Sequence, residues 1–289
     1  MTETWLVGDI GGTNARFALV RDGRIDTDSM LRLPNDDFAA FDDALNHYLS
    51  QAGPVSAIAL SAAGPLTGTD IRMTNRDWTI AAATLRDRCN GGRVEVMNDL
   101  VALGRSVPDL SASDTTVLHK GVAQPGGQWV LLNFGTGFNV APGCTSRAGP
   151  VVLSMEMGQS AIPLPVHACI SAHAPDLAGD IETSEDLFSG RGLARLQARL
   201  GPAAPEVFAR AMAEMTRTVT TAFMPMAGVS IYGGVARAVL DGPARQVFVE
   251  TLARPYRPYD SLNGVPVQMV DADHAALVGC LASLKAPAA

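Results

Sequence analysis

Hydrophobic residues in this chain gather in short runs, with glycine-rich or polar segments between them. The first run, residues 5–10, meets a Gly-Gly-Thr-Asn turn at 11–14, and a second apolar run follows at 16–20. Asp22 and Gly23 then give another turn. Apolar runs joined by turn residues are typical of paired strands. The N-terminal segment is therefore predicted to be a β-hairpin.

Helical spacing follows the hairpin. Apolar side chains recur at Phe38, Phe41, Leu45 and Leu49, which predicts a helix over residues 38–51. Strands and helices then alternate along the chain, and this order favours an α/β architecture. The other expected strands lie at residues 29–33, 55–61, 94–97, 129–134, 138–141, 229–232 and 265–270, and the other expected helices at 81–90, after residue 99, at 205–223 and at 274–284.

One strand–turn–strand plan occurs twice, first over residues 5–19 and again over 129–141, where the turn is Gly-Thr-Gly. At 289 residues the chain is long enough for two modest domains. The junction between the halves is expected near residues 101–113, although no low-complexity linker marks it.

Composition narrows the class of protein. Hydrophobic residues make up 47% of the chain and charged residues 18%, the balance of an ordinary globular enzyme. The net charge of −7 disfavours a nucleic-acid partner, because binding phosphate backbones needs a basic surface. No apolar run approaches the ~18 residues of a membrane span, and no secretory signal is recognisable. We therefore expect no membrane partner and a cytoplasmic location.

The cysteines are few and scattered, and we interpret them as reduced thiols. They stand at Cys89, Cys144, Cys169 and Cys280. His167, Cys169 and His173 are near one another, but their spacing fits no zinc pattern, so no structural zinc is expected.

Candidate chemistry begins at Asp9, which directly precedes the first glycine turn. Glycines let backbone N–H groups converge on an anion, and Thr13 adds a hydroxyl donor. A carboxylate beside bound phosphate requires a bridging cation, so the segment suits a magnesium–nucleotide complex. A plain hairpin turn uses the same residue types and is the alternative interpretation.

Two further glycine elements follow apolar runs, Gly135-Thr136-Gly137 and the turn Gly233-Gly234. Together with the first turn, their number and order favour convergence on one nucleotide. The sequence contains neither a P-loop motif nor a strand-to-helix dinucleotide motif, which excludes those classes of nucleotide site.

Asn98 and Asp99 follow the expected strand at 94–97. An aspartate fixed at a strand end can accept the proton of a sugar hydroxyl during phosphoryl transfer, and Asn98 can hydrogen-bond to the sugar. The alternative is a helix N-cap, which the residues alone favour. Glu156 and Glu185 are the other candidates, since carboxylates accept hydrogen bonds from vicinal hydroxyls, although isolated glutamates are mostly solvated.

These segments resemble the bacterial glucokinase family, in the family's order and over most of the chain. Residues 6–16 are similar to its N-terminal phosphate motif, and the stretch Met73-Thr74-Asn75 with Trp78 is similar to its MTN-x-x-W segment. The other resembling segments are Asn98-Asp99, Gly135-Thr136-Gly137, residues 184–190 and residues 232–235.

The resemblance implies a two-domain hexokinase/actin-like (ribonuclease H-like) α/β fold with an interdomain cleft. A small domain would cover residues 1–105, with a C-terminal helix at 272–289 returning to it, and a large domain 106–271. The implied activity is a glycolytic one, transfer of the γ-phosphoryl group of ATP to the 6-hydroxyl of glucose. ATP and Mg²⁺ would be the cofactors, and a homodimer is one option for the assembly.

The resemblance also assigns roles to residues. Asp99 would be the catalytic base, and Asp9 would meet Mg²⁺ through ATP. The sugar would be bound by Asn98, Asp99, Glu156, Gln159 and Glu185. The nucleotide would be bound by Asp9, Gly11, Gly12, Thr13, Asn14, Gly135, Thr136, Gly137, Gly233 and Gly234.

The run at residues 155–159 departs from the family pattern, Gly-Glu-Gly-Gly-His. Met155 and Met157 replace glycines, and Gln159 replaces a sugar-contacting histidine. Bulkier side chains can reshape a pocket, so the preferred hexose is open. One alternative function is a sugar-binding protein of the same fold that has altered specificity or has lost kinase activity. Another is an actin-fold phosphatase or acyl kinase, against which Asn98-Asp99 and the Met73 segment argue.

Overall fold

The computed structural model describes residues 3–287 and divides the chain into two compact units. The first unit contains the described residues up to 110, together with 145–152 and those from 272 onward. The second unit contains residues 111–144 and 153–271. The domains expected from the sequence are residues 1–105 with 272–289 and residues 106–271. That these are separate domains stays a prediction.

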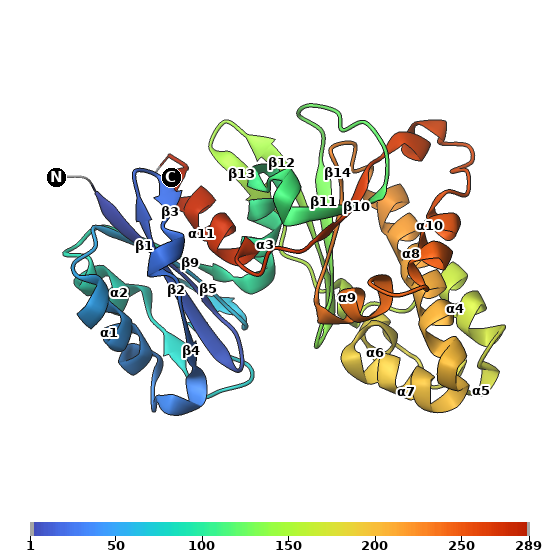
Figure 1. The fold of residues 1–289 in the computed structure, drawn as a ribbon, viewed down its shortest axis with the longest axis horizontal. Helices are drawn as coiled ribbons and strands as arrows, with labels where there is room; N and C mark the ends of the chain where they lie inside the picture. Colours follow the sequence, from blue (N-terminus) through green and yellow to red (C-terminus); the bar gives the residue numbers. More distant parts are fainter. Residues whose placement is uncertain (1–2, 288–289) are drawn as a thin grey trace. The chain divides into compact units, whose positions relative to one another are not determined.

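The first unit is built on a mixed sheet in the order β3-β2-β1-β5-β9, with β4 paired to β2. The hairpin of β1 and β2 is antiparallel, whereas β1, β5 and β9 run parallel. Its strands are β1 (Thr4–Ile10), β2 (Asn14–Arg21), β3 (Arg24–Ile25), β4 (Leu31–Pro34), β5 (Ala57–Ala62) and β9 (Arg93–Asn98). Figure 1 shows α1 (Phe41–Ala52) and α2 (Ala82–Arg88) on one side of this sheet, and α3 (Asp99–Ser106) and α11 (Ala275–Lys285) on the other.

Apolar side chains explain this layering. Every residue of β5 is buried, as expected for a central strand that is covered on both faces. The ring of Phe17 packs against Phe41 and Tyr48 beneath α1. On the other face, α11 and α3 approach so closely that a Cβ on Gly279 would stand 1.8 Å from the Ala102 carbonyl oxygen. Glycine at this position therefore permits the helix contact.

A small three-stranded sheet stands beside the main one in the first unit. It consists of β6 (Leu66–Thr67), β7 (Asp70–Arg72) and β8 (Thr79–Ile80). The sequence pattern predicts no strand between residues 61 and 94, so these three strands differ from that prediction. Strands of two or three residues are too short to show an alternating pattern.

The second unit is built on a sheet in the order β10-β15-β14-β11-β12. Its core includes the contacting rings of Phe134, Phe138, Phe188 and Phe208. The strands are β10 (Thr115–His119), β11 (Trp129–Phe134), β12 (Phe138–Ser146), β14 (Gly228–Tyr232) and β15 (Val267–Val270). The strand β13 (Gly149–Val152) lies in the stretch 145–152, which groups with the first unit. The helices are α4 (Leu164–Ser171), α5 (Pro175–Ala178), α6 (Ser184–Phe188), α7 (Gly190–Leu200), α8 (Ala204–Phe223), α9 (Gly234–Leu240) and α10 (Arg245–Leu252).

Most of the expected elements are confirmed, with shifted ends. The helix expected over 38–51 begins at Phe41, and the strand expected at 138–141 extends to Ser146. The expected turn at Gly233-Gly234 is the junction of β14 with α9, so the third glycine element leads into a helix. Within the described residues, no helix is long and apolar enough to cross a membrane.

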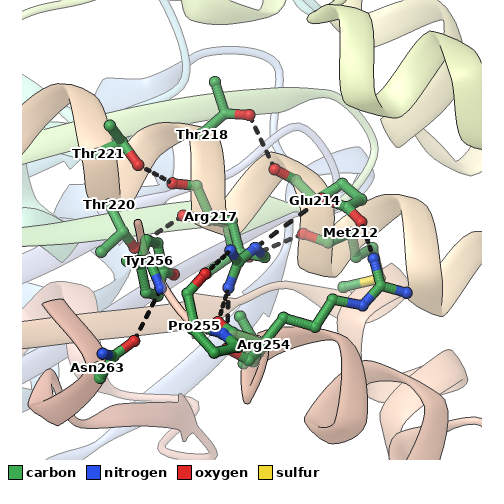
Figure 2. Close-up of polar contacts among 12 residues, drawn as sticks. Met212, Glu214, Arg217, Thr218, Thr220, Thr221, Arg254, Pro255, Tyr256 and Asn263 are labelled. Carbon is green, nitrogen blue, oxygen red and sulfur yellow. Dashed lines mark hydrogen bonds and ion pairs between the residues drawn. The ribbon is translucent and has the colours of Figure 1, made fainter. Parts of the chain in front are cut away.

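Arg217 of α8 fastens the segment that follows α10, as Figure 2 shows. Its guanidinium donates to the carbonyl oxygens of Leu252 at 3.1 Å, Arg254 at 2.5 Å and Pro255 at 3.2 Å. It also lies 4.1 Å from the ring centroid of Tyr256. This one side chain therefore donates hydrogen bonds to carbonyl groups at and beyond the C-terminal end of α10, where helical partners are lacking.

Candidate functional site

The first glycine turn, at the end of β1, is closed by a backbone hydrogen bond. The Gly11 N–H donates to the Asn14 carbonyl oxygen at 3.0 Å. Asn35 holds the turn from outside, because its Nδ2 donates to the Gly11 oxygen at 2.8 Å and its backbone N–H donates to the Thr13 oxygen at 2.9 Å. Asn35 is fully buried, whereas Thr13 is exposed and offers its hydroxyl to a ligand.

The segment containing Met73 and Trp78 lies beside this turn. Both side chains are buried in the core of the first unit, and the Trp78 indole donates to the Ala39 carbonyl oxygen at 3.2 Å. A Cβ on Gly12 would stand 3.5 Å from Asn75, which follows Met73 in the same segment. Met73 and Trp78 therefore anchor the Met-Thr-Asn-x-x-Trp stretch in the core, while its exposed Asn75 lies against the glycine turn.

Asp9 is the second-last residue of β1, and Ser61 of β5 is its register partner. The Ser61 hydroxyl donates to Asp9 Oδ1 at 2.7 Å. Burial raises the pKa of Asp9, while the Ser61 hydrogen bond and the charge of Arg16 act in the opposite direction. The carboxylate thus has a hydrogen bond and a nearby cation, but its charge is incompletely compensated.

Asn98 and Asp99 stand at the same edge of the sheet as Asp9. Ile10, Ala62 and Asn98 are register partners across β1, β5 and β9, so the carboxyl ends of these parallel strands coincide. The Asn98 side chain accepts a hydrogen bond from the Leu100 N–H at 2.9 Å and donates to the Gly64 oxygen at 3.1 Å. Asn98 is therefore the N-cap of α3, the role that the residues alone suggested for this pair.

Asp99 is the first residue of α3, and its Oδ1 accepts from the Leu100 N–H at 2.8 Å. Burial and, second, the negative charge of Asp9 raise the pKa of Asp99 to about 6. A carboxylate with such a pKa holds a proton far more readily than an ordinary aspartate and is still ionised at neutral pH. These are the properties of a general base.

The pair of carboxylates also suits a divalent cation. Burial and, second, the negative charge of Asp9 raise the pKa values of Asp99 and of the Cys280 thiol. Oxygen ligands and excess negative charge are what Mg²⁺ requires. No group of three or more His, Cys, Asp or Glu side chains that could hold a metal occurs in residues 3–287, so phosphate oxygens and water would have to complete the coordination.

The second unit gathers the other glycine elements around the end of β11. The Gly135 N–H donates to the Gly137 oxygen at 2.9 Å, and the Gly190 N–H donates to the Gly135 oxygen at 3.1 Å. Gly233 has a positive φ of 110°, and a Cβ there would stand 2.2 Å from the Phe134 oxygen. Glycine is therefore required where α9 begins against β11, and Thr136 is left exposed between the two glycines of its turn.

Glu185 lies against this second turn. Its Oε2 is 3.4 Å from the Phe138 N–H donor and would be 2.7 Å from a Cβ on Gly137. The same oxygen would be 3.4 Å from a Cβ on Gly158. The two glycines thus leave the space that the carboxylate occupies, while Arg191 lies 4.0 Å from its other oxygen.

Glu156 and Gln159 are exposed and stand on the same short turn. The Gln159 N–H donates to the Glu156 carbonyl oxygen at 3.1 Å. Asn139 donates from Nδ2 to Glu156 Oε2 at 3.1 Å. The side chains of Glu156 and Glu185 are therefore tied to Asn139 and Phe138, which directly follow the Gly135–Gly137 turn, whereas Gln159 is joined to Glu156 through its backbone N–H.

The structure thus assembles the candidate residues in two sets. One set, in the first unit, combines Asp9, Asn98 and Asp99 with the turn at residues 11–14; the other, in the second unit, combines the remaining candidates. Sequence reasoning missed the residues that hold these side chains, namely Asn35, Ser61 and Asn139. Only their polarity beside apolar strands could have indicated them.

Known proteins are similar to this chain over most of its length. The model of the family described as Glucokinase matches residues 6–204 and 197–287. A glucokinase of Marinobacter nauticus is 37% identical over 155 residues, 53% of this chain and 48% of that protein. One of Caulobacter vibrioides is 29% identical over 318 residues, 96% of this chain and 94% of that protein. The crystal structure of a glucokinase from an Antarctic psychrotroph superposes with a TM-score of 0.83 at 24% identity, covering 98% of each chain.

The family match and the fold shared with a solved glucokinase define a sugar kinase of the two-domain hexokinase/actin-like class. Within that class the family match extends over nearly the whole chain. The chain belongs to the glucokinase family.

Proposed function

We propose that the protein transfers the γ-phosphoryl group of ATP to the 6-hydroxyl of glucose. The observation that carries this proposal is the placement of Asp99, with a pKa raised to about 6, at the aligned ends of β1, β5 and β9 beside Asp9. The family match supports the same reaction.

Asp99 is the base in this reaction. Its carboxylate takes the proton of the sugar 6-hydroxyl while the bond from that oxygen to the γ-phosphorus forms and the bond from the γ-phosphorus to the bridging oxygen of ADP breaks. The products are glucose 6-phosphate, ADP and one proton, which Asp99 returns to solvent. The sugar 6-oxygen is now bonded to phosphorus, so the proton does not return to that oxygen.

The remaining candidates bind and orient the reactants. Asp9, helped by the Ser61 hydroxyl, would hold Mg²⁺ through its water and phosphate ligands, and the metal would neutralise charge on the phosphates. The amide groups of the glycine elements, with the exposed hydroxyls of Thr13 and Thr136, donate to phosphate oxygens. Asn98, Glu156, Gln159 and Glu185 hydrogen-bond to sugar hydroxyls.

A coupled assay that measures ADP release across a panel of hexoses with magnesium and ATP tests the proposal. We expect sugar-dependent turnover, highest with glucose. If no hexose stimulates ADP release, the proposed reaction is wrong. Sugar binding detected by calorimetry without turnover would favour the alternative, a sugar-binding protein, which the replaced glycines at Met155 and Met157 motivate.

The cytoplasmic location and the homodimer stay predictions of the sequence. Fractionation of the cells and sedimentation of the purified protein would test them separately.

A further inference from the structure

Asn139 of β12 makes side-chain hydrogen bonds to three consecutive residues around Glu156. Its Nδ2 donates to the Met155 carbonyl oxygen at 2.7 Å and to Glu156 Oε2 at 3.1 Å. Its Oδ1 accepts from the Met157 N–H at 2.9 Å. The side chain therefore binds the backbone on both sides of Glu156 and also the Glu156 carboxylate.

Only an amide side chain can make this set of bonds. An amide has two N–H hydrogens to donate and a carbonyl oxygen with two lone pairs. In Asn139 the second lone pair accepts from the Val140 N–H at 2.9 Å, so the oxygen is fully used. An aspartate could not donate, and an alanine or glycine could do neither.

The segment that carries Glu156 needs such support. Residues 153–156 have no regular secondary structure, and a 3₁₀ turn follows at Met157–Gln159. The Met157 side chain packs against the core of the second unit, which gives the segment an apolar anchor. Asn139 and Met157 thus hold the segment on both sides of Glu156.

The geometry also leaves part of the Glu156 carboxylate available. Asn139 contacts Oε2, and no residue among 3–287 is found to donate to Oε1. Glu156 is exposed, so Oε1 can accept from a ligand hydroxyl. A carboxylate with one oxygen held by an amide presents the other in a fixed direction, which lowers the entropy lost on binding.

We propose that Asn139 is a positioning residue that orients Glu156 toward a sugar hydroxyl and so determines the affinity for the hexose. This role rests on the proposed sugar kinase function. Asn139 acts through Glu156 and has no direct part in phosphoryl transfer.

The test compares the wild type with Asn139→Ala and Asn139→Asp. Asn263→Ala is the matched control, because the Asn263 side chain also accepts from a backbone N–H, that of Tyr256 at 2.8 Å, on a segment that carries no candidate site residue. We expect Asn139→Ala to raise the KM for glucose roughly 10-fold or more, as for the loss of a hydrogen bond to a charged group. The KM for ATP should change less than about twofold, a change too small to reflect a lost hydrogen bond.

Asn139→Asp should be the more damaging change, because it places a second carboxylate against Glu156. Two adjacent carboxylates share a proton at lower pH. The ratio of the glucose KM of this variant to that of the wild type should therefore fall as the pH is lowered from about 8 to about 6. A purely structural role would not give this recovery.

Two further measurements judge the proposal independently of turnover. Amide hydrogen exchange at Met157 should accelerate in Asn139→Ala and stay unchanged in Asn263→Ala, because only the former loses the acceptor of that N–H. Calorimetry should show weaker glucose binding by Asn139→Ala, even if the wild type binds sugar without turning it over.

The outcomes separate the two proposals. Unchanged exchange at Met157 would show that the Asn139 contacts are absent in solution. Accelerated exchange with an unchanged glucose KM and Kd would reduce Asn139 to a structural residue. If the wild type binds glucose but releases no ADP, and Asn139→Ala binds glucose more weakly, the kinase function is refuted and the Asn139 role is upheld. A wild type that binds no hexose would refute both.

Discussion

Two carboxylates with unequal environments lie at the ends of neighbouring strands, Asp9 on β1 and Asp99 after β9. Burial raises the pKa values of both, and the charge of Asp9 adds to the effect on Asp99. Burying a charge costs folding free energy, so the two buried carboxylates lower the stability of the folded protein. The same burial gives them the shifted pKa values that are common at functional sites. Substitutions of these residues should therefore separate activity from stability.

Asp99→Asn should lower kcat by roughly 10²- to 10⁴-fold, the usual contribution of a general base. The variant should melt no lower than the wild type near neutral pH, because a buried charge and its repulsion by Asp9 are both removed. A coupled assay and a thermal melt by circular dichroism measure the two effects. Near-normal turnover would remove Asp99 from the role of base.

The pH dependence follows from the same shift. The pKa of Asp99 rises from 3.8 to about 6 in the folded state, so between these values the folded protein binds the proton more tightly than the unfolded chain. The contribution of this group to stability therefore falls as the pH rises through that window. Activity moves the opposite way, because the base must be ionised: kcat/KM should fall as the pH drops through about 6.

Asp9→Asn provides the check on that assignment. Removing the Asp9 charge lowers the pKa of Asp99, so the acid limb of whatever activity remains should move to lower pH. An acid limb that stays in place would mean that another group controls it.

At the scale of elements, the Arg217 contacts shown in Figure 2 hold the segment after α10 against α8. Arg217→Lys keeps the charge but cannot reach several carbonyl oxygens in a fixed fork or stack equally well on Tyr256. We expect a loss of about 1–3 kcal/mol in the free energy of unfolding. Urea denaturation measures it, with exposed Arg257→Lys in the same segment as the control. Equal stability of the two variants would contradict the structural role of Arg217.

The elements that the sequence predicted well are those with a clear local pattern. The apolar run at 129–134 and the helical pattern at 205–223 predicted a strand and a helix, and the structure has β11 and α8 there. The short strands β6–β8 lack such a period, and the helix α9 begins with glycine, a poor helix former that indicates a turn.

The candidate site divides in the same way. Asp9 and Asn98-Asp99 could be singled out because they end apolar strands. Glu156 and Glu185 were candidates only as carboxylates, without a supporting pattern, and Gln159 was named through the family resemblance alone. The hydrogen bonds of Ser61 to Asp9 and of Asn139 to Glu156 join residues far apart in sequence. Only the folded chain brings such partners together, so no local pattern could have shown them.

At the scale of the whole molecule, the first unit is assembled from separate stretches of chain, and α11 packs on α3 through Gly279. Glycine to alanine inside a helix normally stabilises a protein by up to about 1 kcal/mol. Here Gly279→Ala should destabilise, because its Cβ would overlap the Ala102 oxygen. Thermal melting measures the sign, and Gly264→Ala, where a Cβ meets nothing within 4 Å, is the control. A more stable Gly279→Ala would contradict the close helix contact.

The discontinuous first unit has a consequence for biosynthesis. The ribosome delivers the strand with Asp9 before the second unit and the helix α11 after it, so residues 111–144 and 153–271 are all made before α11. A nascent chain that stops before residue 275 lacks the helix that covers β1 and β5. Premature termination before α11 should therefore disable the proposed catalytic carboxylates, although they are made well before that helix.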